Sequence, residues 1–239
     1  MKILVSQRLV CGLSIPDGRS LTINGFTFLP DFEGELQARH IQTIVEANTK
    51  EEATEKAGNL FTDFLSKLTL IDNSKYVLDD ELFITEVEGN GTATHTKSIS
   101  GKAFIVKDGN TIKNTYEQNI INKKLRIRPL RLYREAINTS NIFERYRNFY
   151  RVLECYGTTK PITDWIKTQK SKVEMKKNNQ GKDISIYAWI RIKLSHSKTG
   201  RKDLEPLFIY NPEHVAIVNK YLPKIQELSR SKIKEREGI

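Results

Sequence analysis

Arg191 and His196 are the two residues whose types and spacing could carry chemistry in this chain. Histidine titrates near neutral pH and arginine stays positively charged, so the pair could combine proton transfer with the binding of an anion. On an ideal helix, positions five apart point about 140° away from each other. The two side chains therefore converge only if the helix ends before His196, or if a second subunit completes the site. The alternative is a structural role, with Arg191 ion-paired to an acidic residue such as Glu154 and His196 capping the helix C-terminus.

Other enzyme signatures are absent from the sequence. There is no CxxC, HExxH, phosphate-binding glycine loop or GxSxG, and Gly89-Asn90-Gly91 is typical of a hairpin turn. Cys11 and Cys155 lie 144 residues apart, which is neither a disulfide framework nor metal-ligand spacing. We therefore expect no metal and no cofactor. The remaining histidines are interpreted as surface or strand residues: His40, His95 and His214.

The charge of the chain is unevenly distributed. Residues 1–120 hold 12 Lys and Arg against 17 Asp and Glu, a net charge of −5, whereas residues 121–239 hold 27 against 12, a net charge of +15. This asymmetry favours two units, the basic one facing a polyanion; a general enrichment in surface lysine is the alternative. Residues 167–182 are rich in lysine and poor in apolar residues, so we expect a mobile basic loop there. The predicted RNA-binding residues are Lys172, Lys176, Lys177, Lys193 and Lys198.

The first half has the pattern of an α+β domain, an antiparallel sheet plus one helix. The helix is predicted to begin with the capping box Thr49-Lys50-Glu51-Glu52, followed by an apolar stripe from Ala53 to Leu68. This half contains no nucleophile, metal cluster or phosphate loop, so its expected role is structural or partner-binding. Short β-prone runs separated by turn residues predict strands over 9–15, 26–29, 41–46, 81–87 and 102–107.

The second half predicts an all-α bundle. Residues 110–124 are interpreted as a linker, which places the domains at 1–122 and 123–239. A capped helix is expected after Asn141, ended by Gly157, and another after Asn211-Pro212, kinked at Pro223 and frayed over its basic tail, 231–236. Further helices are predicted over 131–137, 163–166 and from Asp183 to Leu194.

Residues 130–230 resemble the HEPN superfamily of helical-bundle proteins. The stretch Leu132-Tyr133-Arg134-Glu135-Ala136, the helix from Phe143 to Glu154, and Arg191 to His196 are similar to the helices and the R-x4-6-H motif of methylamine-utilisation-type and related HEPN proteins. One position departs from the pattern: Ile192 stands where active members usually carry a polar residue after the arginine.

The resemblance implies a metal-independent endoribonuclease, with a role as a defence or toxin effector. His196 would act as general acid or base while the RNA 2′-hydroxyl attacks phosphorus, leaving a 2′,3′-cyclic phosphate, and Arg191 would stabilise phosphoryl charge. It also implies a homodimer with a composite site, and single-stranded RNA or tRNA as partner. The alternative is a non-catalytic module that binds RNA or protein, with the acidic domain as docking surface. A DNA-associated defence component is a further alternative.

The sequence also suggests a compartment. No apolar run reaches the roughly 18 residues of a transmembrane helix, and the apolar stretch at the N-terminus is short for a signal peptide. We therefore expect a cytoplasmic protein with no membrane partner.

Overall fold

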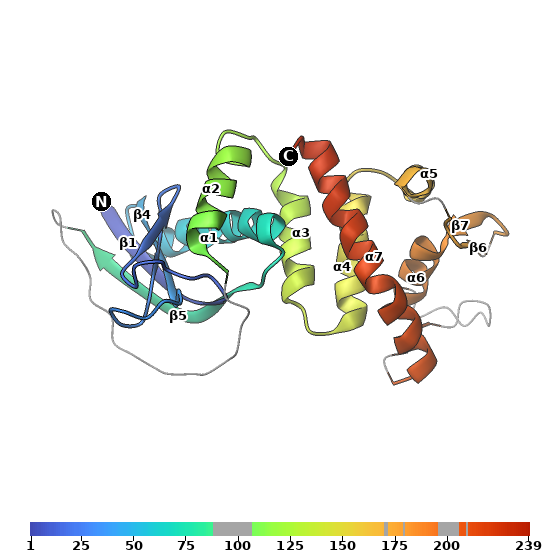
Figure 1. Ribbon diagram of the computed structural model, residues 1–239, viewed down its shortest axis with the longest axis horizontal. Coiled ribbons are helices and arrows are strands. Elements are labelled where there is room, and N and C mark those ends of the chain that lie inside the picture. The colour runs from blue at the N-terminus through green and yellow to red at the C-terminus, as the bar shows by residue number, and fades with distance from the viewer. Residues whose placement is uncertain (88–106, 170–171, 179, 196–205, 209) are drawn as a thin grey trace. The chain divides into compact units, whose positions relative to one another are not determined.

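The computed structural model describes residues 1–87, 107–169, 172–178, 180–195, 206–208 and 210–239 (Figure 1). The chain divides into two compact units, residues 1–124 and residues 125–239. The expected layout, an α+β region followed by a helical one, is confirmed. Within it, the structure adds a second helix to the first unit and a small β-hairpin to the second.

The first unit is built on a five-stranded antiparallel sheet with the strand order β2-β3-β4-β1-β5. Strand β1 lies next to the edge strand β5 and pairs with it on one side and with β4 on the other, with a register shift between Gln7 and Leu9 on the β5 side. The apolar residues Ile3, Val5 and Leu9 of β1 are buried, and so are its polar residues Ser6 and Arg8, as in a strand inside a sheet. The strands are β1 (Lys2–Cys11), β2 (Leu21–Ile23), β3 (Phe26–Leu29), β4 (His40–Glu46) and β5 (Tyr76–Glu86).

The strand predictions need correction at several points. The first strand runs from Lys2 to Cys11 rather than over 9–15, and β5 begins at Tyr76 rather than at residue 81. The short strand β2 was missed because three residues carry too little periodicity. The strand expected over 102–107 lies outside the described residues except for Lys107, which bridges to Leu13.

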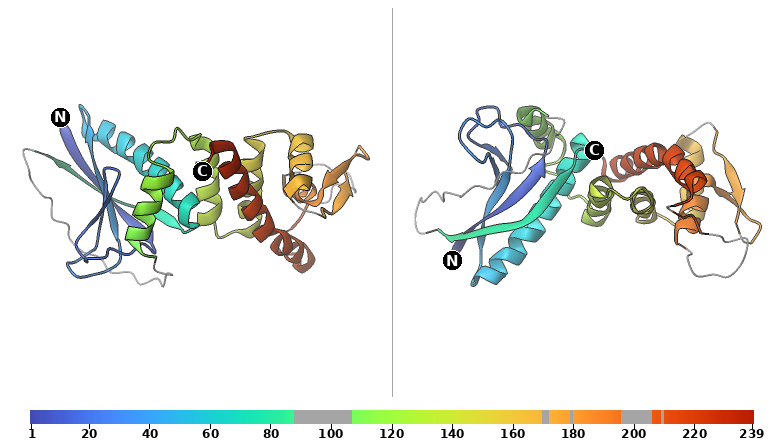
Figure 2. Two further views of the ribbon diagram at one scale, coloured as in Figure 1. Left: turned by 45° about the horizontal axis from the view of Figure 1, so that its top comes forward. Right: turned by 90° about the horizontal axis from the view of Figure 1, so that it is seen from below.

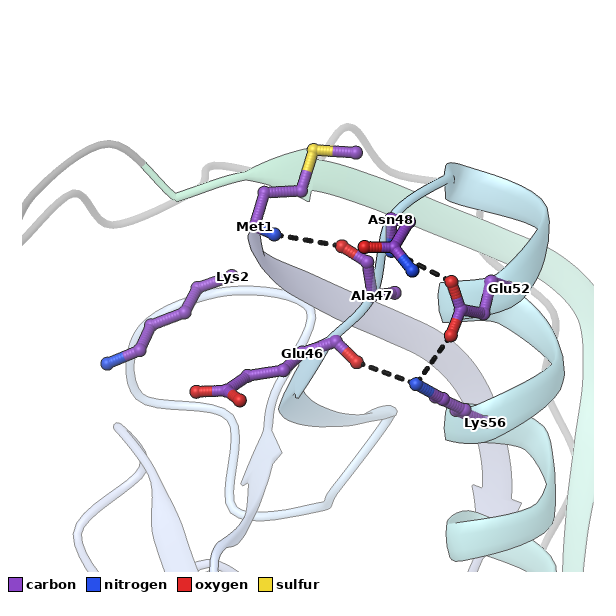
Figure 3. A pocket seen from close by; sticks show the side chains of 7 residues that line it. All are labelled: Met1, Lys2, Glu46, Ala47, Asn48, Glu52 and Lys56. Carbon is purple, nitrogen blue, oxygen red and sulfur yellow. Dashed lines mark hydrogen bonds and ion pairs between the residues drawn. The ribbon is translucent and has the colours of Figure 1, made fainter.

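Helix α1 (Lys50–Asp72) packs along the sheet, as Figure 2 shows. The Thr49 hydroxyl accepts a hydrogen bond from the Glu52 N–H at 3.1 Å, as the capping box predicts. The Glu52 carboxylate accepts from the N–H of Asn48 at 2.8 Å, one residue before the N-cap (Figure 3). It also forms an ion pair with Lys56 at 2.6 Å. The cap is therefore present, with its return bond shifted by one residue.

The predicted linker is largely a helix, α2 (Gly109–Asn119). Asp108 caps it by accepting from the N–H of Thr111 at 2.9 Å. Ile112 and Tyr116 are buried, and the Tyr116 ring lies edge-on to Phe64 of α1 with the ring centroids 5.4 Å apart. Only these few apolar positions mark the helix, so its otherwise polar sequence resembles a linker.

The second unit is organised around a helical hairpin. Helices α3 (Ile127–Asn138) and α4 (Ile142–Glu154) pack together, and α7 (Pro212–Glu237) packs on both. The predicted cap is confirmed: the Asn141 carboxamide accepts from the N–H of Phe143 at 2.9 Å. Gly157 does not end α4, because Cys155 holds the C-cap position. The core between these helices contains fully buried side chains: Leu130, Tyr133, Tyr146, Phe149, Leu153 and Ile225.

The predicted basic loop is partly ordered. Helix α5 (Thr159–Gln169) extends into it, and strand β6 (Met175–Lys177) pairs with β7 (Asp183–Ser185) in an antiparallel hairpin. The Asn178 side chain closes the turn by accepting from the N–H groups of Gln180 and Lys182, both at 2.9 Å. Helix α6 (Ile186–Ser195) follows this hairpin, so it starts three residues after the predicted Asp183.

The C-terminal tail is helical rather than frayed. Ile233 is buried, and the carboxylates of Glu235 and Glu237 accept from Trp165 Nε1 at 2.6 Å and from the Tyr156 hydroxyl at 2.8 Å. These bonds join residues about seventy or more positions apart, and local sequence cannot predict such partners. Pro223 lies inside α7. Among the helices that the structure describes, none has the length and apolar character needed to cross a membrane.

Candidate functional site

Arg191 lies on α6 and is held by an acid of the neighbouring helix α4. Its Nη2 lies 2.9 Å from Oε1 of Glu154, and both side chains are about one-third exposed, at 31% and 30%. Helix α6 is fixed in place by apolar residues such as Ile190 and Leu194, which are buried against α4. The ion pair is therefore partly shielded from water, and it matches the structural alternative named for Arg191.

Tyr150 stands beside this ion pair. Its hydroxyl is buried, and no hydrogen-bond partner for it exists among the described residues. Burial raises the pKa of Tyr150, and the Glu154 carboxylate adds to the increase while Arg191 opposes it. The phenol is therefore neutral at physiological pH and can offer a hydrogen-bond donor in a setting of low dielectric constant.

Arg147 of α4 brings a second guanidinium toward the end of α6. Its Nη2 donates to the carbonyl oxygen of Leu194 at 3.0 Å and lies 3.2 Å from a carboxylate oxygen of Glu144. A cation near the last carbonyls of a helix is favourable because of the helix dipole. Arg147 thus stabilises the turn of α6 that leads to His196.

The Arg191 guanidinium keeps part of its binding capacity. Glu154 occupies Nη2, and Nε is buried without a partner among the described residues. Nη1 is the nitrogen left to bind an anion, since a guanidinium has five N–H donors. Ile192 is half-buried. His196 and Lys198 lie outside the described residues, so the structure places only Arg191 of the predicted catalytic pair.

The predicted RNA-binding lysines are distributed over the hairpin and α6. Lys172, Lys176 and Lys177 are exposed. Lys176 pairs with Glu174 at 3.0 Å and Lys177 with Asp183 at 2.8 Å, so each shares its charge with an acid. Lys193 is half-buried, with its ammonium nitrogen 5.5 Å from the ring centroid of Trp189.

Sequence reasoning missed a basic cluster on α7 around Tyr221. The ammonium groups of Lys220 and Lys224 lie 5.2 and 5.4 Å from the Tyr221 ring centroid. The Tyr221 hydroxyl donates to Glu174, and this bond, followed by Lys176, lowers the pKa of that carboxyl. The spacing of Lys220 and Lys224, four residues apart around a tyrosine on a helix, was the available signal.

The described part of the first unit contains a buried polar cluster and a pocket beside α1. His40 Nε2 lies 2.8 Å from Oδ1 of Asp31, the other oxygen of this carboxylate, Oδ2, lies 3.9 Å from Nη2 of Arg8, and all three side chains are largely buried. The pocket, of about 370 Å³, opens beside the start of α1, and the bonds among its lining residues include the one from the Asn48 N–H to Glu52 at the helix cap (Figure 3). Among the described residues, no three His, Cys, Asp or Glu side chains gather in a way that could hold a metal ion.

The comparisons with known proteins concern the second unit. No curated protein and no solved structure matches the chain. Residues 129–234, which include most of α3 and α7, the elements between them and Arg191, are similar to the family described as methylamine utilization protein MauJ.

Proposed function

We propose that the second unit is a HEPN-type RNA-binding domain that acts as a metal-independent endoribonuclease. One observation carries the proposal: Arg191 is held, partly exposed, by Glu154 near the end of α6. In the sequence, His196 directly follows the last residue of this helix. The similarity of residues 129–234 to the MauJ family agrees with the methylamine-utilisation part of the sequence resemblance. The excess of basic residues in this half supports a polyanionic substrate.

In the proposed reaction, the RNA supplies its own nucleophile. His196 removes the proton from the 2′-hydroxyl, the 2′-oxygen bonds to the adjacent phosphorus, and the bond to the 5′-oxygen breaks. The departing oxygen receives a proton from a second acid, a role open to His196 of the other subunit in a homodimer. Nη1 of Arg191 donates to a phosphoryl oxygen as negative charge builds there. The products are a 2′,3′-cyclic phosphate and a 5′-hydroxyl.

Glu154 has a defined place in this proposal. It fixes the guanidinium by one nitrogen and leaves another for phosphate, so it is a positioning residue. The same ion pair favours the second candidate, an RNA-binding module without cleavage, because Glu154 neutralises Arg191 in a partly shielded setting. Ile192 favours this second candidate as well.

The test is a cleavage assay with the full chain on single-stranded RNA, tRNA and DNA of matched sequence, in the presence of EDTA. We expect cleavage of RNA alone, with 2′,3′-cyclic phosphate ends, because DNA lacks the 2′-hydroxyl. His196→Ala should abolish cleavage and leave RNA affinity unchanged, because this residue acts in the transition state. Arg191→Ala should reduce both cleavage and affinity.

Two outcomes decide between the candidates. RNA binding without cleavage, equal in wild type and His196→Ala, would establish the binding module instead. If the site is composite, light scattering should show a dimer, and mixing His196→Ala with Arg191→Ala subunits should restore part of the activity. A strictly monomeric active enzyme would exclude the composite site.

A further inference from the structure

A second site lies in the C-terminal unit between α5 and the β6–β7 hairpin, which lie next to each other in Figure 1. A pocket of about 480 Å³ opens there. This volume is within the roughly 300–1,000 Å³ range of ligand-binding pockets. Three lysines line it, Lys160 and Lys167 from α5 and Lys182 from the hairpin.

The pocket carries an excess of positive charge once its acids are paired. Asp183 is bound by Lys177 at 2.8 Å, and Asp164 lies 3.8 Å from Lys167. Lys160 and Lys182 are exposed and have no ion pair among the described residues. Lys160 comes from α5 and Lys182 from the hairpin, so the positive charge of the pocket is contributed by both elements that line it.

The backbone of α5 adds donors at the same place. The first hydrogen bond at its start runs from the N–H of Ile162 to the carbonyl of Thr158. The N–H groups of Thr159 and Lys160 therefore precede the intrahelical ladder. The positive end of the helix dipole favours an anion there.

The walls of the pocket are preformed. Thr163 and Ile184, both lining residues, are buried, and the Thr163 hydroxyl lies 3.4 Å from the hydroxyl of Ser185 across the two elements. Asn178 holds the turn that presents Lys182. A ligand would therefore meet an ordered pocket with an apolar wall and a cationic rim.

We propose that this pocket binds a phosphate ester group attached to a small organic body. The ester belongs either to a nucleotide of an RNA strand or to a free phosphorylated small molecule. The first of these two sources rests on the proposed function. Phosphate matches two ammonium groups and the free N–H groups of a helix start, and the apolar wall accommodates the organic part.

The experiment is a titration of the full-length protein with inorganic phosphate, uridine 5′-monophosphate and a single-stranded oligoribonucleotide, followed by calorimetry and by NMR of backbone amides. We expect the monophosphate to shift the amide signals of Thr159 and Lys160 and to bind more tightly than inorganic phosphate. The variant Lys160→Gln/Lys182→Gln should weaken its binding roughly tenfold or more. Lys160→Arg/Lys182→Arg should retain it.

The matched control is Lys220→Gln/Lys224→Gln, which removes the same charge from α7, outside the pocket. It should bind the monophosphate like wild type. If the pocket double variant also binds the oligoribonucleotide more weakly, the ester belongs to RNA; if RNA affinity is unchanged, it belongs to a free ligand. Wild type that binds neither phosphate nor the monophosphate, or a pocket variant that binds like wild type, would overturn the proposal. The cleavage assay is independent of these readouts, so either proposal can fail alone.

Discussion

Arg191, Glu154 and Tyr150 form the polar group most directly related to the proposed chemistry. The ion pair between Arg191 and Glu154 was named from the sequence as an alternative, because an arginine in a helical bundle needs an acid. Tyr150 could not be identified, since its aromatic ring follows the same stripe as the core residues Tyr146 and Phe149. Burial of its hydroxyl depends on how α6 meets α4, which periodicity does not specify.

Glu154→Gln should weaken RNA binding several-fold, because it releases the guanidinium that the Glu154 carboxylate positions for phosphate. It should also lower the free energy of unfolding by about 1 kcal/mol, since the pair is partly shielded. A double-mutant cycle with Arg191→Gln, measured by urea denaturation and RNA titration, isolates the interaction of the pair. Stronger RNA binding by Glu154→Gln would instead mean that the carboxylate competes with phosphate for the guanidinium rather than positioning it.

Asp72 gives a pH-dependent prediction in the first unit. Burial raises its pKa in the folded state, against the opposing hydrogen bonds from Ser74 and Tyr76. The unfolded chain, with an Asp pKa of about 3.9, then loses its proton first, so the wild type loses stability as the pH rises above that value. Asp72→Asn removes this dependence. The free energy of unfolding of the variant minus that of the wild type should therefore be more positive near pH 7 than near pH 3. The same difference at both pH values would contradict the raised pKa of Asp72.

At the scale of elements, the long helices with a periodic apolar stripe were predictable. The elements that are short or contain few apolar residues were not. The caps at Thr49, Asn141 and Asn211 are local signals and were found. Helix α2 and the β6–β7 hairpin depend on partners elsewhere in the chain, because neither has enough apolar residues of its own. The pocket beside α5 could not be predicted for the same reason, since it exists only where the hairpin forms.

Two helical glycines give opposite predictions for the same substitution. Gly58, in α1, has open space where a Cβ would lie, so Gly58→Ala should stabilise the protein by about 0.5–1 kcal/mol. Gly109 begins α2 against the carbonyl oxygen of Ser14 and the side chain of Leu21, so Gly109→Ala should destabilise it by more than 1 kcal/mol. Urea denaturation of both variants is the measurement. A stabilising Gly109→Ala would mean that α2 does not pack on the segment around Ser14.

At the scale of the whole molecule, the excess of positive charge in the sequence belongs to the second unit. Residues 125–239 carry 25 Lys and Arg against 12 Asp and Glu. Composition alone predicted this imbalance, but it could not show which lysines cluster, since α7 and the hairpin lie far apart in sequence. Lys220 and Lys224 lie over the ring of Tyr221, whose hydroxyl donates to Glu174. Glu174 also forms an ion pair with the predicted Lys176, so the three lysines belong to one cluster.

RNA affinity should fall steeply with salt, because binding releases counterions. Lys220→Gln/Lys224→Gln should reduce the slope of log affinity against log salt by up to roughly 0.7 for each lysine that contacts a phosphate. Lys67→Gln/Lys75→Gln removes the same charge from the first unit and should leave the slope unchanged. Equal effects of the two variants would point to net charge alone rather than to the α7 cluster.

The two tryptophans, Trp165 and Trp189, both belong to the second unit, and each has a lysine ammonium over its indole ring, at 4.3 Å for Lys232 and 5.5 Å for Lys193. Fluorescence excited selectively at tryptophan rather than tyrosine therefore reports on the unfolding of residues 125–239 alone. Far-ultraviolet circular dichroism records the secondary structure of both units. Comparing the two signals during denaturation distinguishes one cooperative transition from two separate ones. Trp189 stands two positions before Arg191, so phosphate that draws Lys193 away from the ring would change the emission, and the protein carries its own optical probe of the proposed site.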